Sequence, residues 1–336
     1  MAVSAIVANA ARKNERAVIE GVQVIRVARL GTIASMPVCP GLTNAIRQCP
    51  ADLVHIHVPN PGAAFAFLRS GHRGKLVVTH HADTLGRKAL RRLSDPFVRQ
   101  VMDCADAIIV TSSRYLRSSE ELNPFVEKCQ VIPLGIEPVS ASANSDPLGL
   151  RDVSGDPLIL AIGRLVPYKG FDVLIRAMKH VNATLLLIGS GPEARELEML
   201  ASREGVQEKI RMLGRVVDLQ PYFQMASIFV LPSTTRAEAF GMVQIEAMAA
   251  GLPVINTDID SGVPEVSVHG ETGLTVEPGN SDALAKAIQF LLNEDELRKK
   301  LGKAAMAKVH KEYTADLMAE RTSELYRKIL NRTDAE

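Results

Sequence analysis

The chain has 336 residues, of which 46% are hydrophobic and 23% charged, and its 39 basic and 38 acidic residues leave a formal net charge of +1. This composition is typical of a globular protein of about two domains and excludes a disordered, collagen-like or coiled-coil chain. The balanced charge gives no indication of nucleic-acid binding, and an aromatic content of 4% without tryptophan argues against stacking surfaces for bases.

Short apolar runs alternate with helical patterns over most of the chain. Several of these runs contain successive valines and isoleucines, which is typical of strands buried on both faces of a parallel sheet. In the first half we expect strands at 3–8, 22–27, 52–58, 75–80, 107–111 and 129–134. In the second half we expect them at 158–163, 184–189, 209–213, 228–232, 253–257 and 273–276. The alternation predicts an α/β fold with doubly wound sheets.

A break in this alternation predicts the domain organisation. Residues 138–157 are rich in Ser, Pro, Gly and Asp, lack periodicity and are typical of a linker. We therefore expect a first domain over 1–145, a second over 146–314, and a C-terminal helical segment over 315–336.

Two carboxylates, Glu238 and Glu246, flank the start of a helix expected at 242–250. The first N–H groups of a helix lack intrahelical acceptors, and a glycine beside them, here Gly241, is typical of an anion site. Both carboxylates could therefore flank one ligand. From chemistry alone, a surface glutamate and an unrelated helix glutamate fit equally well.

Two cations, Arg164 and Lys169, follow the strand expected at 158–163. Ligands of open α/β sheets bind outside the carboxyl ends of the strands, and two cations at such an end suit a diphosphate. An exposed loop with ordinary charges is the alternative interpretation.

A third candidate, at 189–194, matches the dinucleotide pattern G-x-G-x-x-A. That pattern requires an acid at the end of the next strand, and the strand expected at 209–213 ends in Leu213, Gly214 and Arg215 instead. We therefore interpret Gly189 as part of a turn that faces a nucleotide, and an NAD-dependent dehydrogenase is disfavoured.

Histidines in the first half suggest further chemistry. The strand expected at 75–80 ends in His80, and His81 and Asp83 come directly after it. An imidazole at this strand end could donate a hydrogen bond or act in acid/base catalysis. His55 and His57 form an H-x-H pair, but no later Lys, His and Asp pattern completes a metal hydrolase site.

Three remaining features receive simpler interpretations. Asp258 and Asp260 form a D-x-D that we interpret as a turn or helix cap rather than a metal site. The basic stretch 86–99 is interleaved with apolar residues, so it is either a solvated helix face or a contact for an anionic membrane. The four cysteines form no C-x-x-C pair, and no apolar run approaches the ~18 residues that span a bilayer.

Together these segments resemble the retaining glycosyltransferases of family 4, whose GT-B fold has two Rossmann-like domains facing a cleft. The resemblance covers nearly the whole chain and rests on the motifs at 162–170, 187–193, 212–216, 238–254 and 270–279. The most specific feature is the Glu238 and Glu246 pair with a Gly-Arg…Lys loop upstream. The segment 256–264 is similar to bacterial rhamnosyl- or mannosyltransferases that build surface polysaccharide.

The resemblance implies roles for individual residues. Arg164 and Lys169 would bind the donor diphosphate, and Glu246 would bind the ribose. The implied catalytic residues are Glu238, His81, Arg164 and Lys169. The implied donor-binding residues are Arg164, Lys169, Gly189, Leu213, Gly214, Glu238, Phe240, Gly241, Met242, Val243 and Glu246.

The resemblance also implies the partners. The donor would be a UDP- or GDP-sugar, the acceptor a glycan or a polyprenyl-diphosphate-linked glycan, and neither a metal nor another cofactor would be needed. We expect a cytoplasmic chain, and the basic composition of 86–99 makes this stretch the candidate for a contact with the inner face of the membrane. Two alternatives stay open, a sugar-nucleotide epimerase on the same fold and a nucleotide-binding remnant without turnover.

One departure from the family concerns the start of the chain. Family members begin with a strand, a glycine-rich loop and a helix ahead of the strand that 3–8 resembles, and this opening is absent. Because the first strand of a doubly wound sheet is central, we expect a gap in the first sheet. We also expect low stability of the first domain and impaired transfer.

Overall fold

The computed structural model describes residues 2–33, 36–83, 88–137 and 157–331, the side chains of 88–95 excepted. Its backbone forms two compact units. Unit 1 comprises Met1–Val110, Ser119–Val131 and Thr322–Glu336, and unit 2 comprises Thr111–Ser118 and Ile132–Arg321.

The units differ from the predicted domains in three places, while the predicted boundary at 145 lies outside the described residues. Residues 132–137 belong to unit 2 although they were predicted in the first domain. Helix α4 (Ser113–Ser118) belongs to unit 2, although the strands before and after it belong to unit 1. The carboxylate of Glu265 accepts hydrogen bonds from the backbone N–H groups of Ser113 and Arg114, at 3.2 and 2.8 Å, and so ties α4 to unit 2. Helix α12 (Ala315–Leu330) begins in unit 2, and its part from Thr322 onward belongs to unit 1.

Unit 2 contains one parallel sheet in the order β12-β11-β10-β13-β14-β15. This is the doubly wound order 3-2-1-4-5-6, and ligands of such sheets bind where the order reverses, here between β10 and β13. The strands are β10 (Leu158–Ile162), β11 (Thr184–Ile188), β12 (Ile210–Gly214), β13 (Ile228–Val230), β14 (Val254–Thr257) and β15 (Gly273–Val276). The predicted doubly wound architecture is therefore confirmed.

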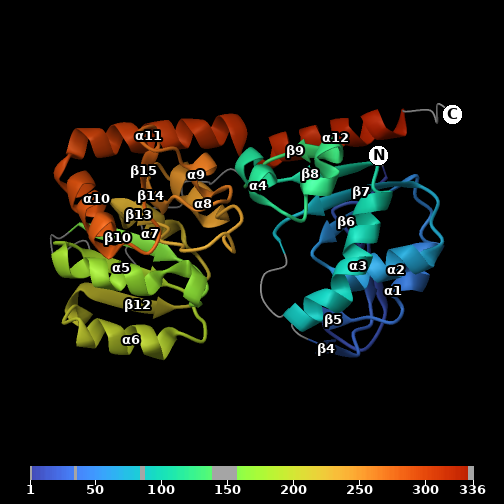
Figure 1. The fold of residues 1–336 in the computed structure, drawn as a ribbon, viewed down its shortest axis with the longest axis horizontal. Coiled ribbons are helices and arrows are strands. Elements are labelled where there is room, and N and C mark those ends of the chain that lie inside the picture. Colours follow the sequence, from blue (N-terminus) through green and yellow to red (C-terminus); the bar gives the residue numbers. More distant parts are fainter. Residues whose placement is uncertain (1, 34–35, 84–87, 138–156, 332–336) are drawn as a thin grey trace. The chain divides into compact units, whose positions relative to one another are not determined.

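Helices cover both faces of this sheet because alternate side chains of each strand point to opposite sides (Figure 1). In β10, Ile159 and Ala161 pack into one apolar cluster with α5, α6 and α10, while Leu160 and Ile162 pack into another with α7, α8 and α11. The helices are α5 (Phe171–Ala177), α6 (Ala194–Arg203), α7 (Gln220–Met225), α8 (Met242–Ala249), α9 (Val263–Val266), α10 (Ser281–Asn293) and α11 (Asp295–Glu312).

The described strands of unit 1 form separate sheets, and β1 does not pair with β6. One sheet is parallel, with β6 (Leu53–Val58), β7 (Lys75–His80), β8 (Ala107–Val110) and β9 (Cys129–Val131) in chain order. Another has the order β1 (Ser4–Ala8), β3 (Val22–Val27) and β2 (Glu15–Ile19), and β4 (Gly31–Ile33) pairs with β5 (Met36–Val38). The helices of this unit are α1 (Leu42–Gln48), α2 (Pro61–Ser70) and α3 (Lys88–Cys104).

Candidate functional site

The loop after β10 is shaped by two glycines. At Gly170, φ is +66° and a Cβ atom would overlap the carbonyl oxygen of Pro232. At Gly163, a Cβ atom would lie 3.3 Å from Cε of Lys169. The absence of side chains at these positions lets the loop fold back through a short 3-10 helix (Pro167–Lys169), which places Lys169 against the end of β10. Only 8% of Lys169 is exposed.

The charge of Lys169 is matched by Glu238, which follows β13. The Lys169 ammonium forms an ion pair with Oε2 of Glu238, which also accepts a hydrogen bond from the Ser233 hydroxyl at 3.1 Å. The backbone N–H of Thr234 donates to the carbonyl oxygen of Tyr168 at 2.8 Å and ties the two loops together. Both strands border the point where the strand order reverses, so two predicted site residues meet at the expected edge of the sheet.

Arg164 differs from Lys169 in its surroundings. Its side chain is exposed and forms no ion pair or hydrogen bond with any side chain that the structure describes. A guanidinium keeps its charge at any pH that a protein tolerates and offers five N–H donors in one plane. The loop after β10 therefore carries one buried, paired cation and one exposed cation available to an anionic ligand.

Helix α8 begins at the same edge of the sheet. Its N-cap, Gly241, has φ of +74°, and Gln244 makes the first intrahelical bond, from its N–H to the Gly241 carbonyl at 2.9 Å. The N–H groups of Met242 and Val243 have no acceptor within the helix and carry its positive end. The ring of Phe240 is buried against Tyr313, so Phe240 can present only its backbone to a ligand.

Glu246 lies in the second turn of α8 and is half-buried. Burial raises the pKa of this carboxyl. No described residue donates a side-chain hydrogen bond to it. Two hydroxyl groups of a ligand could satisfy such an acceptor.

Gly189, at the end of β11, is joined to the end of β12. Its N–H donates to the carbonyl oxygen of Gly214 at 2.8 Å, which brings Gly189 beside Leu213 and Gly214. The loop after β11 is also tied to the loop after β10, because Glu193 N–H donates to the Leu165 carbonyl at 3.2 Å. The structure therefore gathers all the predicted donor-binding residues in unit 2.

Replacing Gly189 with alanine should destabilise unit 2 far more than Gly205→Ala. Both glycines have positive φ, +152° and +70°. Alanine at Gly205 would meet open space, so it should cost only about 1 kcal/mol of backbone strain. At Gly189 the new methyl would overlap the carbonyl oxygen of Gly163, and we expect a loss of about 3 kcal/mol or more. Urea unfolding of both variants measures the difference, and equal losses would contradict this packing.

His81 follows β7 in unit 1, and its surroundings differ from those of its neighbour. Its N–H donates to the Val58 carbonyl at 3.0 Å, and its ring Nε2 lies 2.8 Å from Nδ1 of His57. Partial burial lowers the pKa of both imidazoles. His80 points to the opposite face of the sheet and is fully buried, with its Nε2 3.3 Å from a carboxylate oxygen of Glu121.

The other predicted clusters have structural partners. Among the described residues, His80, Asp83 and Glu121 place their ligand atoms within 4.8 Å of one another, but His80 contacts Glu121 and Asp83 accepts a hydrogen bond from Ser119. Both ring nitrogens of His55 contact hydroxyl groups, those of Tyr326 and Thr79. His55 is therefore not free to ligate a metal ion together with His57.

The D-x-D segment carries a surface ion pair. Arg114 lies 2.7 Å from a carboxylate oxygen of Asp258 and 3.5 Å from one of Asp260, and both acids are largely exposed. These contacts give both acids a structural partner, and the interpretation as a turn or helix cap stays a prediction.

The basic stretch 86–99 lies mostly outside the described side chains. Its backbone enters α3, whose side chains are described from Pro96 onward. Within the described parts of the chain, no helix has both the length and the apolar composition needed to cross a membrane.

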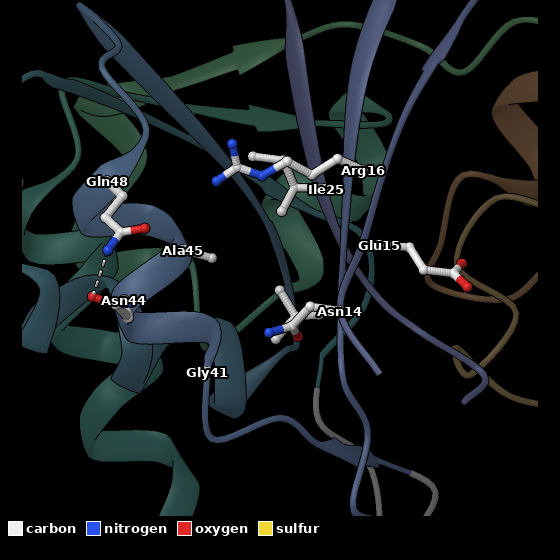
Figure 2. Close-up of a pocket in the computed structure, with 9 residues that line it drawn as sticks. Asn14, Glu15, Arg16, Ile25, Gly41, Asn44, Ala45 and Gln48 are labelled. Carbon is white, nitrogen blue, oxygen red and sulfur yellow. Dashed lines mark hydrogen bonds between the residues drawn. The ribbon is translucent and has the colours of Figure 1, made fainter. Parts of the chain in front are cut away.

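A cavity in unit 1 contains none of the predicted residues. It measures about 310 Å³ and lies between the β2–β3 hairpin and α1 (Figure 2). Arg16 and Ile25 border it from the strands, and Asn44 and Gln48 border it from α1. It shares no lining residue with the site at the end of β10 and β13.

Two contacts of predicted residues were not predicted. Ser233 directly follows the predicted strand 228–232, and that position at a carboxyl strand end was the available signal. His57 was considered only as half of a metal pair, although parallel pairing of β6 with β7 brings it to His81.

Comparisons with known proteins match both halves of the chain. Residues 149–308 match the family model described as glycosyl transferases group 1, and residues 1–135 match a glycosyl transferase 4-like domain. The chain is 31% identical over 271 residues to the D-rhamnosyltransferase WbpZ of Pseudomonas aeruginosa, covering 79% of this chain and 70% of that protein. It is 28% identical over 313 residues to O-antigen chain mannosyltransferase C of Escherichia coli, covering 92% and 84%.

Solved structures share the fold. A sucrose-phosphate synthase from Thermosynechococcus elongatus superposes with a TM-score of 0.80 at 23% identity, covering 98% of this chain and 90% of that chain. Anabaena Alr3699/HepE in complex with UDP and glucose gives a TM-score of 0.75 at 22% identity, covering 91% and 86%.

Proposed function

Because the chain belongs to the group 1 glycosyltransferases and has the GT-B fold, we propose that it is a retaining hexosyltransferase that uses a nucleoside diphosphate sugar. It is a glycosyltransferase, and the named relatives transfer rhamnose or mannose, which favours transfer over the epimerase alternative. The observation that carries the proposal is the Lys169–Glu238 ion pair beside the start of α8, at the point where the strand order reverses.

The donor diphosphate would bind to Arg164, Lys169 and the first N–H groups of α8. An ammonium has three N–H donors, so Lys169 can hold Glu238 with one and phosphate oxygens with the others. Val243 would add a backbone N–H to the phosphate. HepE, which shares this fold, was solved with UDP, and this supports a nucleoside diphosphate as a ligand of the chain.

The remaining residues would hold the ribose, the base and the sugar. Glu246 would accept hydrogen bonds from the ribose hydroxyls, and Gly189, Leu213 and Gly214 would border the base. Glu238 would bind sugar hydroxyls together with the backbone of 240–242. His81, in unit 1, would be the remaining catalytic residue.

Transfer breaks the bond between the anomeric carbon and the leaving phosphate oxygen, and forms a bond from the acceptor hydroxyl on the same face of the sugar. The leaving phosphate takes the proton of that hydroxyl, so charge and atoms balance. Negative charge grows on the diphosphate in the transition state, and fixed cations and N–H dipoles aimed at it lower the barrier. Arg164, Lys169 and α8 would supply this compensation without a metal ion.

The acceptor would be a glycan or a lipid-linked glycan. This class is supported by the relative named O-antigen chain mannosyltransferase C and by a phosphatidylinositol monomannoside mannosyltransferase of Corynebacterium glutamicum at 29% identity. The basic stretch 86–99 would bring the enzyme to the anionic inner face of the membrane.

A donor screen tests the proposal. We expect UDP- or GDP-hexoses to raise the melting temperature, and one of them to donate its sugar to a lipid-linked glycan with retained anomeric configuration. Transfer should persist in EDTA, because the cations of the chain compensate the leaving group. A loss of transfer in EDTA that Mg²⁺ restores would contradict the metal-free mechanism. Binding without turnover would indicate the nucleotide-binding remnant.

A further inference from the structure

Three histidines of unit 1 form a connected row at the carboxyl ends of β6 and β7. The register pairs His57 with Thr79, and side chains alternate along each strand, so His55, His57, Thr79 and His81 share one face of the sheet. The rings of His55 and His57 stack with centroids 4.7 Å apart and planes 21° from parallel. The planes of His57 and His81 are 13° apart, with centroids at 5.1 Å.

The first member of the row is fixed by two hydroxyl groups. Nδ1 of His55 lies 2.5 Å from the Tyr326 hydroxyl on α12, and Nε2 lies 2.6 Å from the Thr79 hydroxyl. The pKa of His55 is lowered to about 3, mainly by burial and to a smaller extent by the charges of the neighbouring His57 and His81. This ring therefore stays neutral at physiological pH. His55 is neutral and hydrogen-bonded through both ring nitrogens, so its ring is fixed. It therefore restricts the orientation of the His57 ring that stacks on it.

The contact between His57 and His81 restricts their protons. A hydrogen bond between two ring nitrogens needs a proton on one and a lone pair on the other. When Nδ1 of His57 donates, Nε2 of His81 is bare and its Nδ1 carries the proton. When Nε2 of His81 donates, its Nδ1 becomes an acceptor. The tautomer of His57 therefore determines whether Nδ1 of His81 is a hydrogen-bond donor or an acceptor.

We infer that His57 is a positioning residue that fixes the ring plane and the tautomer of His81. The inference rests on the proposed function, in which His81 is a catalytic residue. His57 acts through His81 and needs no contact with the substrate.

The test compares His57→Leu with His57→Asn in the full chain labelled with ¹⁵N-histidine. The leucine removes the hydrogen bond, whereas the Asn side-chain amide places a nitrogen near the former Nδ1. In His57→Leu we expect the imidazole ¹⁵N signals of His81 to change from one tautomer to a mixture. We also expect turnover to fall about 10- to 100-fold, since misplacing a group at a reacting centre costs up to about 100-fold. His57→Asn should restore most of the turnover and the single tautomer.

The exposed His310 on α11 provides a control, because His310→Leu should change neither the His81 signals nor the turnover. Unchanged His81 signals in His57→Leu would overturn the inference, and so would a changed tautomer with unchanged turnover. If the wild-type chain transfers no sugar, the proposed function fails, while the ¹⁵N spectra still report whether His57 sets the tautomer.

Discussion

Lys169→Ala is expected to lower kcat/KM by about 100- to 1,000-fold. Removing one preorganised group that stabilises transition-state charge has an effect of this size in other enzymes. The substitution should also lower the free energy of unfolding by about 3–5 kcal/mol, because it leaves the Glu238 carboxylate buried without its cation. The side chains of the pair are only 10% and 11% exposed, so solvent compensates the lost partner weakly. Turnover and urea unfolding measure the two effects.

The double variant Lys169→Met/Glu238→Gln separates catalysis from folding. It removes both charges and keeps similar volumes, and replacing a whole buried ion pair is often neutral for stability. We therefore expect the free energy of unfolding to return to within about 1 kcal/mol of wild type while turnover stays low.

The surface pair of Lys179 and Glu204 is a matched control. Their charged atoms lie 2.9 Å apart, with side chains 47% and 19% exposed. Replacing them with Met and Gln should change the free energy of unfolding by less than about 1 kcal/mol and leave turnover unchanged. If Lys169→Ala transferred sugar at the wild-type rate, the role assigned to Lys169 would be refuted.

The sheet of unit 2 could be predicted because its strands are buried on both faces. In β10, Leu158–Ile162 is buried throughout, and such a strand is visible as a continuous apolar run. The start of α8 could be predicted because Gly241 precedes an apolar helical pattern. These signals are local, and the doubly wound order then places the following loops at one edge of the sheet.

The pairings within the site could not be predicted, because each depends on contacts between distant segments. The Lys169–Glu238 ion pair requires the loops after β10 and β13 to lie side by side, which is a consequence of strand order. The His57–His81 contact depends on the register of β6 and β7. Strand β2 was missed because its hairpin turn, Glu20-Gly21, lacks the usual Asn-Gly or Asp-Gly, yet both residues adopt the positive φ that a tight turn requires.

Arg164→Ala is expected to lower kcat/KM by about 100-fold or more without weakening the fold. Arg164 is exposed and has no side-chain partner in the described part of the chain, so its removal should change the free energy of unfolding by less than about 0.5 kcal/mol. This contrast with Lys169 follows from burial and pairing alone, since both residues lie in the loop after β10.

Calorimetric titration locates the loss at the diphosphate. Affinity for the nucleoside diphosphate should fall in Arg164→Ala, while affinity for the corresponding nucleoside should stay unchanged. Arg164→Lys should recover only part of the affinity, because an ammonium keeps the charge but lacks the planar fork that binds two phosphate oxygens together. Arg211, exposed on β12 of the same sheet, supplies the control, and Arg211→Ala should bind both ligands as wild type does. Equal losses for the nucleoside and its diphosphate would place Arg164 elsewhere in the donor site and remove it from stabilisation of the leaving group.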